Sequence, residues 1–261
     1  MSSGKTPWGA LKFADQKEIR LEWAQLQIRL IRRGSDLLLV EQRGNSEIVQ
    51  LGDDPESDFR RYAFERAIHT IYVQPRMPDR PIVVQPLHPL RLAPKANVDF
   101  YVSIPVDIQI STNRAEGAEG TENLERIRSE LLSDTWFGDR TAGVLCYSTK
   151  SRARREAPSV DTAISTRAVC KVCIHNKSNE QLHCTKFCLR LNHCHLWQSG
   201  QAIWTSPVDI RYNGSEQLSA IDYSEQAPPE LVGAIKIADA PDPPATGLIR
   251  RSFASLSTAL A

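Results

Sequence analysis

The sequence predicts an all-β, or at least β-dominated, protein on two observations. Apolar residues occupy every second position from Val102 to Ile110, which is the pattern of a strand with one buried face. The sixteen prolines and thirteen glycines lie largely between such short runs, as in sandwiches and barrels. The other runs are Leu37–Val40, Ile68–Val73, Pro81–Gln85, Gly143–Tyr147 and Pro207–Tyr212. We therefore expect two packed β-sandwich-like units.

The segment Ile19–Ile31 fits either a strand or a helix. Its alternation changes phase near Ala24, which a β-bulge would explain, while Ile19, Trp23 and Leu26 also have helical spacing. We favour a strand, because the turn residues 33–36 then lead directly into another apolar run and complete a hairpin. Within the run that starts at Tyr101, Pro105 lacks an amide donor and indicates an edge strand or a bulge.

The order of these features predicts five segments along the chain. An N-terminal arm, 1–17, precedes an N-terminal β unit at 18–112. An acidic loop with one short helix follows at 113–135, and a C-terminal β-sandwich unit occupies 136–237. The Pro-rich residues 238–261 resist regular structure and form a peripheral tail.

The short helix is expected near 121–133. Thr121 is a suitable N-cap, and Leu124, Ile127 and Leu131 follow at spacings that place them on one helical face. The helix would interrupt the β pattern between the two units.

Charge and composition restrict the function classes. Lys plus Arg number 32 and Asp plus Glu number 31, so no net field favours a nucleic acid as partner. The first residues carry no apolar leader, and no apolar run approaches the roughly 20 residues of a spanning helix. These observations predict a cytoplasmic protein without a membrane span, whose six cysteines remain thiols.

Five of the six cysteines and four of the six histidines lie between Cys170 and His195. The segment alternates like two strands joined by a turn at 177–180. On a strand, Cys170 and Cys173 point to opposite faces, so their Cys-x-x-Cys spacing is weak support for a metal site. The alternation of the first strand places Cys170 on the face that points to the core.

A hairpin centred near Ser178 gives a sharper zinc hypothesis. One face would then carry a tetrahedral set of ligands, made of Cys173, His175, Cys184 and Cys188. Nearby lysines would favour the thiolates that zinc binds. The competing interpretation is that these cysteines pack as small apolar groups, in which case the protein has no cofactor.

No catalytic residues can be assigned from motifs. His193 and His195 could share a metal as alternate residues of a strand, but nothing nearby identifies a third ligand. A phosphate-binding Gly-rich loop, Gly-x-Ser-x-Gly and His-Glu-x-x-His are all missing from the sequence. Cys146 lies in an apolar run and is interpreted as a buried thiol. Trp136, with two other tryptophans, is interpreted as a core or interface anchor.

A set of short motifs spread over the chain resembles one known family. They are Trp136–Asp139, Gly143–Tyr147, Thr149–Arg152, Ile174–Ser178, Leu196–Trp197, Trp204–Thr205 and Leu248–Phe253. Together they resemble the prokaryotic proteins grouped as domain of unknown function 432, over about Trp8 to Phe253. The resemblance implies a cytoplasmic, β-rich protein with no established biochemical role, hence no catalytic residues to carry over. It also implies aliphatic residues where this chain has Cys170, Cys173 and Cys188.

Three functions remain open from the sequence. The leading hypothesis is a non-catalytic binding or scaffold protein with a protein partner. The second is a zinc-binding protein that uses Cys173, His175, Cys184 and Cys188. The third is a hydrolase whose site is assembled from residues distant in sequence.

Overall fold

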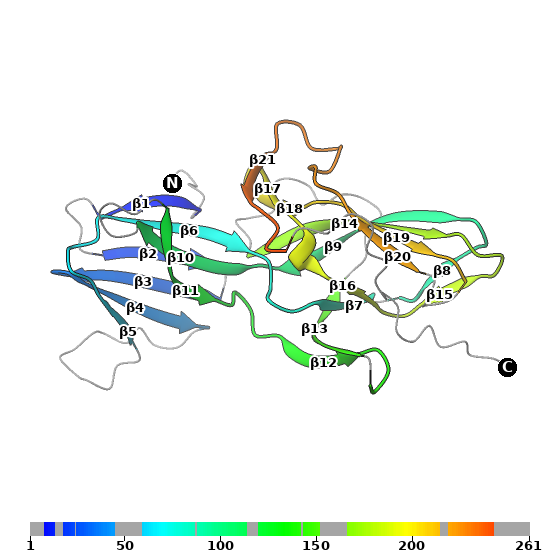
Figure 1. The fold of residues 1–261 in the computed structure, drawn as a ribbon, viewed down its shortest axis with the longest axis horizontal. Coiled ribbons are helices and arrows are strands. Elements are labelled where there is room, and N and C mark those ends of the chain that lie inside the picture. Colours follow the sequence, from blue (N-terminus) through cyan, green and yellow to red (C-terminus); the bar gives the residue numbers. More distant parts are fainter. Residues whose placement is uncertain are drawn as a thin grey trace. The chain divides into compact units, whose positions relative to one another are not determined.

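The computed structural model describes residues 8–13, 18–23, 25–44, 59–86, 88–113, 120–141, 143–151, 166–214 and 219–242. Over these residues the chain is built of strands, with one 3₁₀ turn, η1, at Leu191–His193 (Figure 1). The prediction of an all-β fold is therefore confirmed. Among the same residues, no helix is long and apolar enough to cross a membrane.

The chain divides into two compact units. Unit 1 comprises Met1–Pro75 and Asp107–Ser129, and unit 2 comprises Arg76–Val106 and Glu130–Ala261. The backbone therefore passes from one unit to the other three times. The segment 76–106, which the sequence analysis assigned to the N-terminal unit, belongs to unit 2.

The first sheet of unit 1 has the order β2-β3-β4-β5, and Figure 1 shows these strands side by side. Trp23 of β2 pairs antiparallel with Leu26 of β3, so Ile19–Ile31 forms parts of two strands and not one strand with a bulge; Ala24 itself lies outside the described residues. The expected hairpin at 33–36 is confirmed, with Gly34 at a φ of 62° in its turn. The strands are β2 (Glu18–Trp23), β3 (Leu26–Arg33), β4 (Asp36–Arg43) and β5 (Phe59–Ala63).

The second sheet of unit 1 has the order β1-β6-β10-β11. Its strands are β1 (Gly9–Lys12), β6 (Thr70–Arg76), β10 (Asp107–Asn113) and β11 (Thr121–Ile127). Part of the predicted N-terminal arm thus forms a strand, because residues 9–12 pair with β6. Residues 1–7 and 14–17 of that arm lie outside the described residues.

The prediction of a short helix near 121–133 is wrong. Thr121–Ile127 pairs antiparallel with β10, and Ile127 is buried while Leu131 is 81% exposed. A helix would have needed both residues on one buried face, whereas the strand buries only Ile127 and satisfies its backbone groups on β10. Residues 114–119 of the predicted acidic loop lie outside the described residues.

Charged and polar side chains connect the two sheets of unit 1 above an apolar interior. The Tyr62 hydroxyl of β5 donates a hydrogen bond to Glu125 of β11, and Arg60 lies 3.2 Å from the same carboxylate. Because the Glu125 carboxylate accepts the hydrogen bond from Tyr62 and pairs with the Arg60 guanidinium, its negative charge is compensated at the margin of the core. Buried residues from the two sheets are Leu21, Ile28, Leu30, Leu37, Leu39, Ile71, Val73, Ile108 and Ile110.

The larger sheet of unit 2 is built around β14. This strand pairs antiparallel with β9 along one edge and parallel with β18 and β19 along the other. The sheet order is β20-β19-β14-β18-β17-β21, with β9 on β14. Its strands are β9 (Asn97–Pro105), β14 (Arg167–Asn176), β17 (Leu196–Ser199), β18 (Ala202–Thr205), β19 (Val208–Tyr212), β20 (Ala220–Tyr223) and β21 (Ile235–Ala238).

A smaller sheet of unit 2 has the order β12-β13-β7-β16, and β8 and β15 form a separate two-stranded sheet. The Phe187 ring of β16 meets the Phe100 ring of β9 edge-on at 5.6 Å, so the cores of the two sheets are joined. The strands are β7 (Ile82–Pro86), β8 (Leu90–Leu92), β12 (Ser133–Phe137), β13 (Val144–Ser151), β15 (Leu182–Cys184) and β16 (Phe187–Leu189).

Candidate functional site

The faces of β14 follow the predicted parity. Cys170, Val172 and Ile174 are fully buried, whereas Cys173 and His175 lie on the opposite, partly buried face. The alternation is strict along the whole strand. Sequence reasoning therefore placed these side chains on the correct faces.

The predicted hairpin that would have joined the four zinc ligands is wrong. Both edges of β14 are occupied by β9, β18 and β19, so Cys184 pairs within β15–β8 and Cys188 within β16–β7. Both cysteines are buried, in contrast to the outward face expected for them. Among the described residues, no group of three or more His, Cys, Asp or Glu side chains is placed to hold a metal ion.

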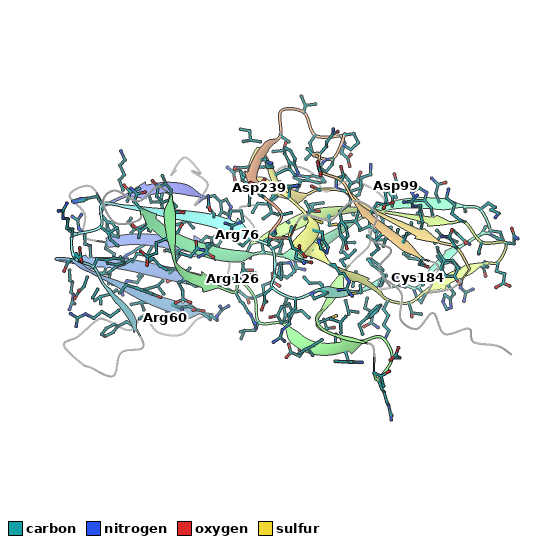
Figure 2. The ribbon with its side chains drawn as sticks, in the orientation of Figure 1. Arg60, Arg76, Asp99, Arg126, Cys184 and Asp239 are labelled. Carbon is teal, nitrogen blue, oxygen red and sulfur yellow. The ribbon has the colours of Figure 1, made fainter. Side chains whose placement is uncertain are left out.

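Cys173 and His175 have acidic neighbours instead of the predicted cysteines. The register places Cys173 beside Asp99 of β9 and Asp209 of β19, and Figure 2 labels Asp99 on its strand, with Cys184 on β15. His175 Nε2 lies 3.3 Å from the Asp209 carboxylate. Burial, followed by a hydrogen bond to Asp99, raises the pKa of Cys173 to about 12. Near neutral pH, Cys173 is therefore a thiol and a poor nucleophile.

On the same face, Tyr101 and Lys171 bind the carboxylate of Glu230. The Tyr101 hydroxyl donates to Glu230 at 2.7 Å, and the Lys171 ammonium lies 3.3 Å from the other oxygen. Lys171 is also 3.8 Å from Asp99. These contacts attach the segment that follows β20 to the sheet. Tyr101 and Lys171 therefore have a structural role on this face.

His193 and His195 hold the last described residues of the chain against unit 2. His193 is buried, and its Nδ1 lies within hydrogen-bond distance of the Asp242 carbonyl oxygen. His195 Nδ1 accepts a hydrogen bond from the Ala240 amide at 3.1 Å. Both imidazoles are thus engaged with residues 240–242, and the remaining residues of the predicted tail, 243–261, lie outside the described part of the chain.

Two exposed large apolar side chains are cross-strand partners on β12 and β13. Trp136 is 49% exposed, and Leu145, its partner across the two strands, is 41% exposed. Cross-strand partners project to the same face, so the two side chains lie side by side. We call them the β12–β13 apolar pair.

The Trp136 ring is held in place by the turn that follows β12. Its Nε1 donates a hydrogen bond to the Asp139 carbonyl oxygen at 2.8 Å. A Cβ atom at Gly143 would lie only 2.6 Å from Cε2 of the ring, so this position requires glycine. The sequence identified Trp136, Trp197 and Trp204 as core or interface anchors but could not decide between the two roles. Trp204 is buried and Trp197 is partly buried, whereas Trp136 is exposed.

Comparison with known families adds one finding. The family described as protein of unknown function (DUF432) matches residues 7–257, nearly the whole chain. The chain belongs to this family. The resemblance seen in the sequence motifs is thereby confirmed. No curated protein and no solved structure matches the chain significantly.

Proposed function

We propose that this DUF432 protein is a non-catalytic binding protein, and that it binds an extended apolar segment of another protein alongside β12. The observation that carries the proposal is the exposed β12–β13 apolar pair beside a sheet edge. β12 ends the sheet order β12-β13-β7-β16, and no other described strand pairs with its outer edge. An open edge offers backbone donors and acceptors to an incoming strand.

The chemistry of the pair favours an apolar partner. The indole N–H of Trp136 is already bound to Asp139, so covering the ring costs no hydrogen bond. Tryptophan is also enriched among the residues that contribute most to protein–protein binding. The acidic residue of the same strand, Asp134, is paired with Arg80 at 3.0 Å, so the edge presents no uncompensated charge to attract a charged ligand.

The partner can be sought by purifying the tagged chain from its own cells and measuring which protein accompanies it at a fixed molar ratio. We expect Trp136→Ser and Leu145→Ser each to weaken that complex at least tenfold, because each removes part of the apolar anchor. In the purified complex, the amides of residues 133–137 should exchange with solvent more slowly than in the free chain.

Val232→Ser is the matched control, because Val232 is 93% exposed in the same unit but lies outside the strands. This variant should keep the partner. Equal losses from Val232→Ser and Leu145→Ser, or a complex insensitive to both β12–β13 variants, would contradict the proposal. A complex that consists only of two copies of this chain would also overturn it.

A further inference from the structure

The Asp139 carbonyl oxygen connects the exposed Trp136 ring to the start of β13. It accepts a hydrogen bond from the indole Nε1 at 2.8 Å and a second one from the Gly143 amide at 3.0 Å. Gly143 directly precedes β13, so one carbonyl group binds both the indole and the backbone at this strand end. The ring is therefore fixed to the turn although Trp136 is 49% exposed.

The Asp139 side chain sets the direction of this carbonyl group. Its Oδ1 accepts hydrogen bonds from the Thr141 amide and from the Thr141 hydroxyl, both at 2.8 Å. A carboxylate that binds the amide two residues further on forms an Asx turn, which fixes the local backbone. Gly138, directly before it, adopts a φ of 113°, a conformation that other residues rarely adopt. The turn therefore directs the Asp139 carbonyl oxygen toward the indole.

Gly143 leaves the space that the indole occupies. A Cβ atom at this position would lie 2.6 Å from Cε2 of the ring and 2.5 Å from the Asp139 carbonyl oxygen. Gly143 does not lie in the left-handed region of φ, so its role here is to make room and not to bend the chain. Any larger residue would push the ring away from its acceptor.

We infer that Asp139 and Gly143 are positioning residues, which hold Trp136 in its binding conformation before the partner arrives. This inference rests on the proposed function. A side chain that is already fixed avoids the entropy cost of being ordered at an interface. Asp139 thus raises the affinity through Trp136. Because the indole N–H stays bound to Asp139, the partner covers the ring with an aliphatic or aromatic side chain and supplies no acceptor.

The first test uses the free chain and heteronuclear NMR of the indole N–H groups. The chain has five tryptophans, and the Trp136 signal is the one that is missing in Trp136→Phe. We expect this N–H to exchange slowly with solvent, because it is hydrogen-bonded. Asp139→Ala should accelerate the exchange by about three- to tenfold, since the Asx turn is lost. Asp139→Asn should keep it slow, because its side-chain oxygen accepts the same two hydrogen bonds.

Two further variants sharpen this test. Gly143→Ala should also accelerate the exchange, because the added Cβ displaces the ring. Arg140→Ala is the matched control, since Arg140 is an exposed residue of the same turn, and it should leave the exchange slow. Equal acceleration in Arg140→Ala and Asp139→Ala, or fast exchange in the unmodified chain, would overturn the inference. The Asp139 variants change only an exposed side chain, so they decide the result if Gly143→Ala does not fold.

The second test uses the complex with the partner. Asp139→Ala should weaken it by about two- to tenfold, because the freed ring has to be ordered on binding. Asp139→Asn and Arg140→Ala should both keep the full affinity. A complex that Trp136→Ser weakens but Asp139→Ala does not would contradict this inference alone. A complex that is insensitive to Trp136→Ser, or the lack of any partner, contradicts the proposed function, and the exchange rates of the free chain still decide whether Asp139 fixes the ring.

Discussion

The first sheet of unit 1 and the larger sheet of unit 2 differ in how far apart in sequence their paired strands lie. In the first sheet of unit 1, β2, β3 and β4 each pair with the next strand along the chain. The second sheet of unit 1 is different, because β1 pairs with β6. In unit 2, β14 pairs with β9, which precedes it by about sixty residues, and with β18 and β19, which follow it. Successive strands can be recognised from alternation and turn residues, whereas distant partners leave no local signal.

The units also differ in what lies inside them. All six cysteines belong to unit 2, and five of them are buried. Unit 1 contains no cysteine and carries ion pairs on the surface of its β2–β5 sheet, such as Arg29 with Glu18 and Arg61 with Asp36. Unit 2 also carries ion pairs, such as Arg167 with Glu130 and Lys171 with Glu230, so the two units differ in their buried thiols and not in surface charge.

The largest expected effect tests whether the units are separate cores. Ile28 of unit 1 and Ile174 of unit 2 are both fully buried, so Ile28→Ala and Ile174→Ala should each lower the free energy of unfolding by about 2–5 kcal/mol. Amide hydrogen exchange should rise mainly in β3 for the first variant and in β14 for the second. Equal loss of protection in both units with either variant would remove the distinction between them.

A smaller effect is expected from the polar link between the sheets of unit 1. Tyr62→Phe removes the hydroxyl that donates to Glu125, and should lower the free energy of unfolding by about 1–2 kcal/mol in urea titrations. Tyr72→Phe is the control, because Tyr72 is a partly buried tyrosine of β6 whose hydroxyl makes no hydrogen bond among the described residues. A loss in Tyr72→Phe as large as in Tyr62→Phe would show that the link to Glu125 contributes nothing specific.

The smallest effect concerns acid. The hydrogen bonds from Arg29 and Arg20 lower the pKa of Glu18 from its ordinary 4.5. Its contribution to stability is therefore present above that pH and is lost as the pH falls through the lowered pKa. Glu18→Gln should reduce the difference in the free energy of unfolding between about pH 7 and about pH 3, measured by urea titration, by only about 0.5 kcal/mol, because the pairs are partly exposed. An unchanged difference would mean that these pairs are screened.

The sequence predicted which side chains of a strand face the core better than it predicted which strands pair with one another. The parity of β14 correctly buried Cys170, Val172 and Ile174, since alternation is a property of the strand itself. The zinc hypothesis additionally required β14 to pair with the strand that follows it, and that edge was already taken by β18 and β19. The zinc content of the chain stays a prediction that elemental analysis can test.

Two other features show where local patterns are insufficient. The apolar spacing at 121–133 is typical of a helix, but Thr121–Ile127 pairs with β10 as a strand. Backbone hydrogen bonds to a neighbouring strand outweigh the intrinsic preference of these residues for a helix. Cys146 was correctly expected to be a buried thiol, but its neighbour Cys188 lies 42 residues away and is brought to it only through β7. Trp136 could be named as an anchor, although its exposure depends on the strand order.

The three crossings of the backbone affect the order in which the molecule can be completed. During synthesis the β2–β5 sheet is available once residue 63 has emerged, but the sheet β1-β6-β10-β11 is complete only after β11, which ends at residue 127. Segment 76–106 emerges before its main partner, β14, exists. A nascent chain therefore carries incomplete sheets from both units at once, and no single proteolytic cut can release either unit whole.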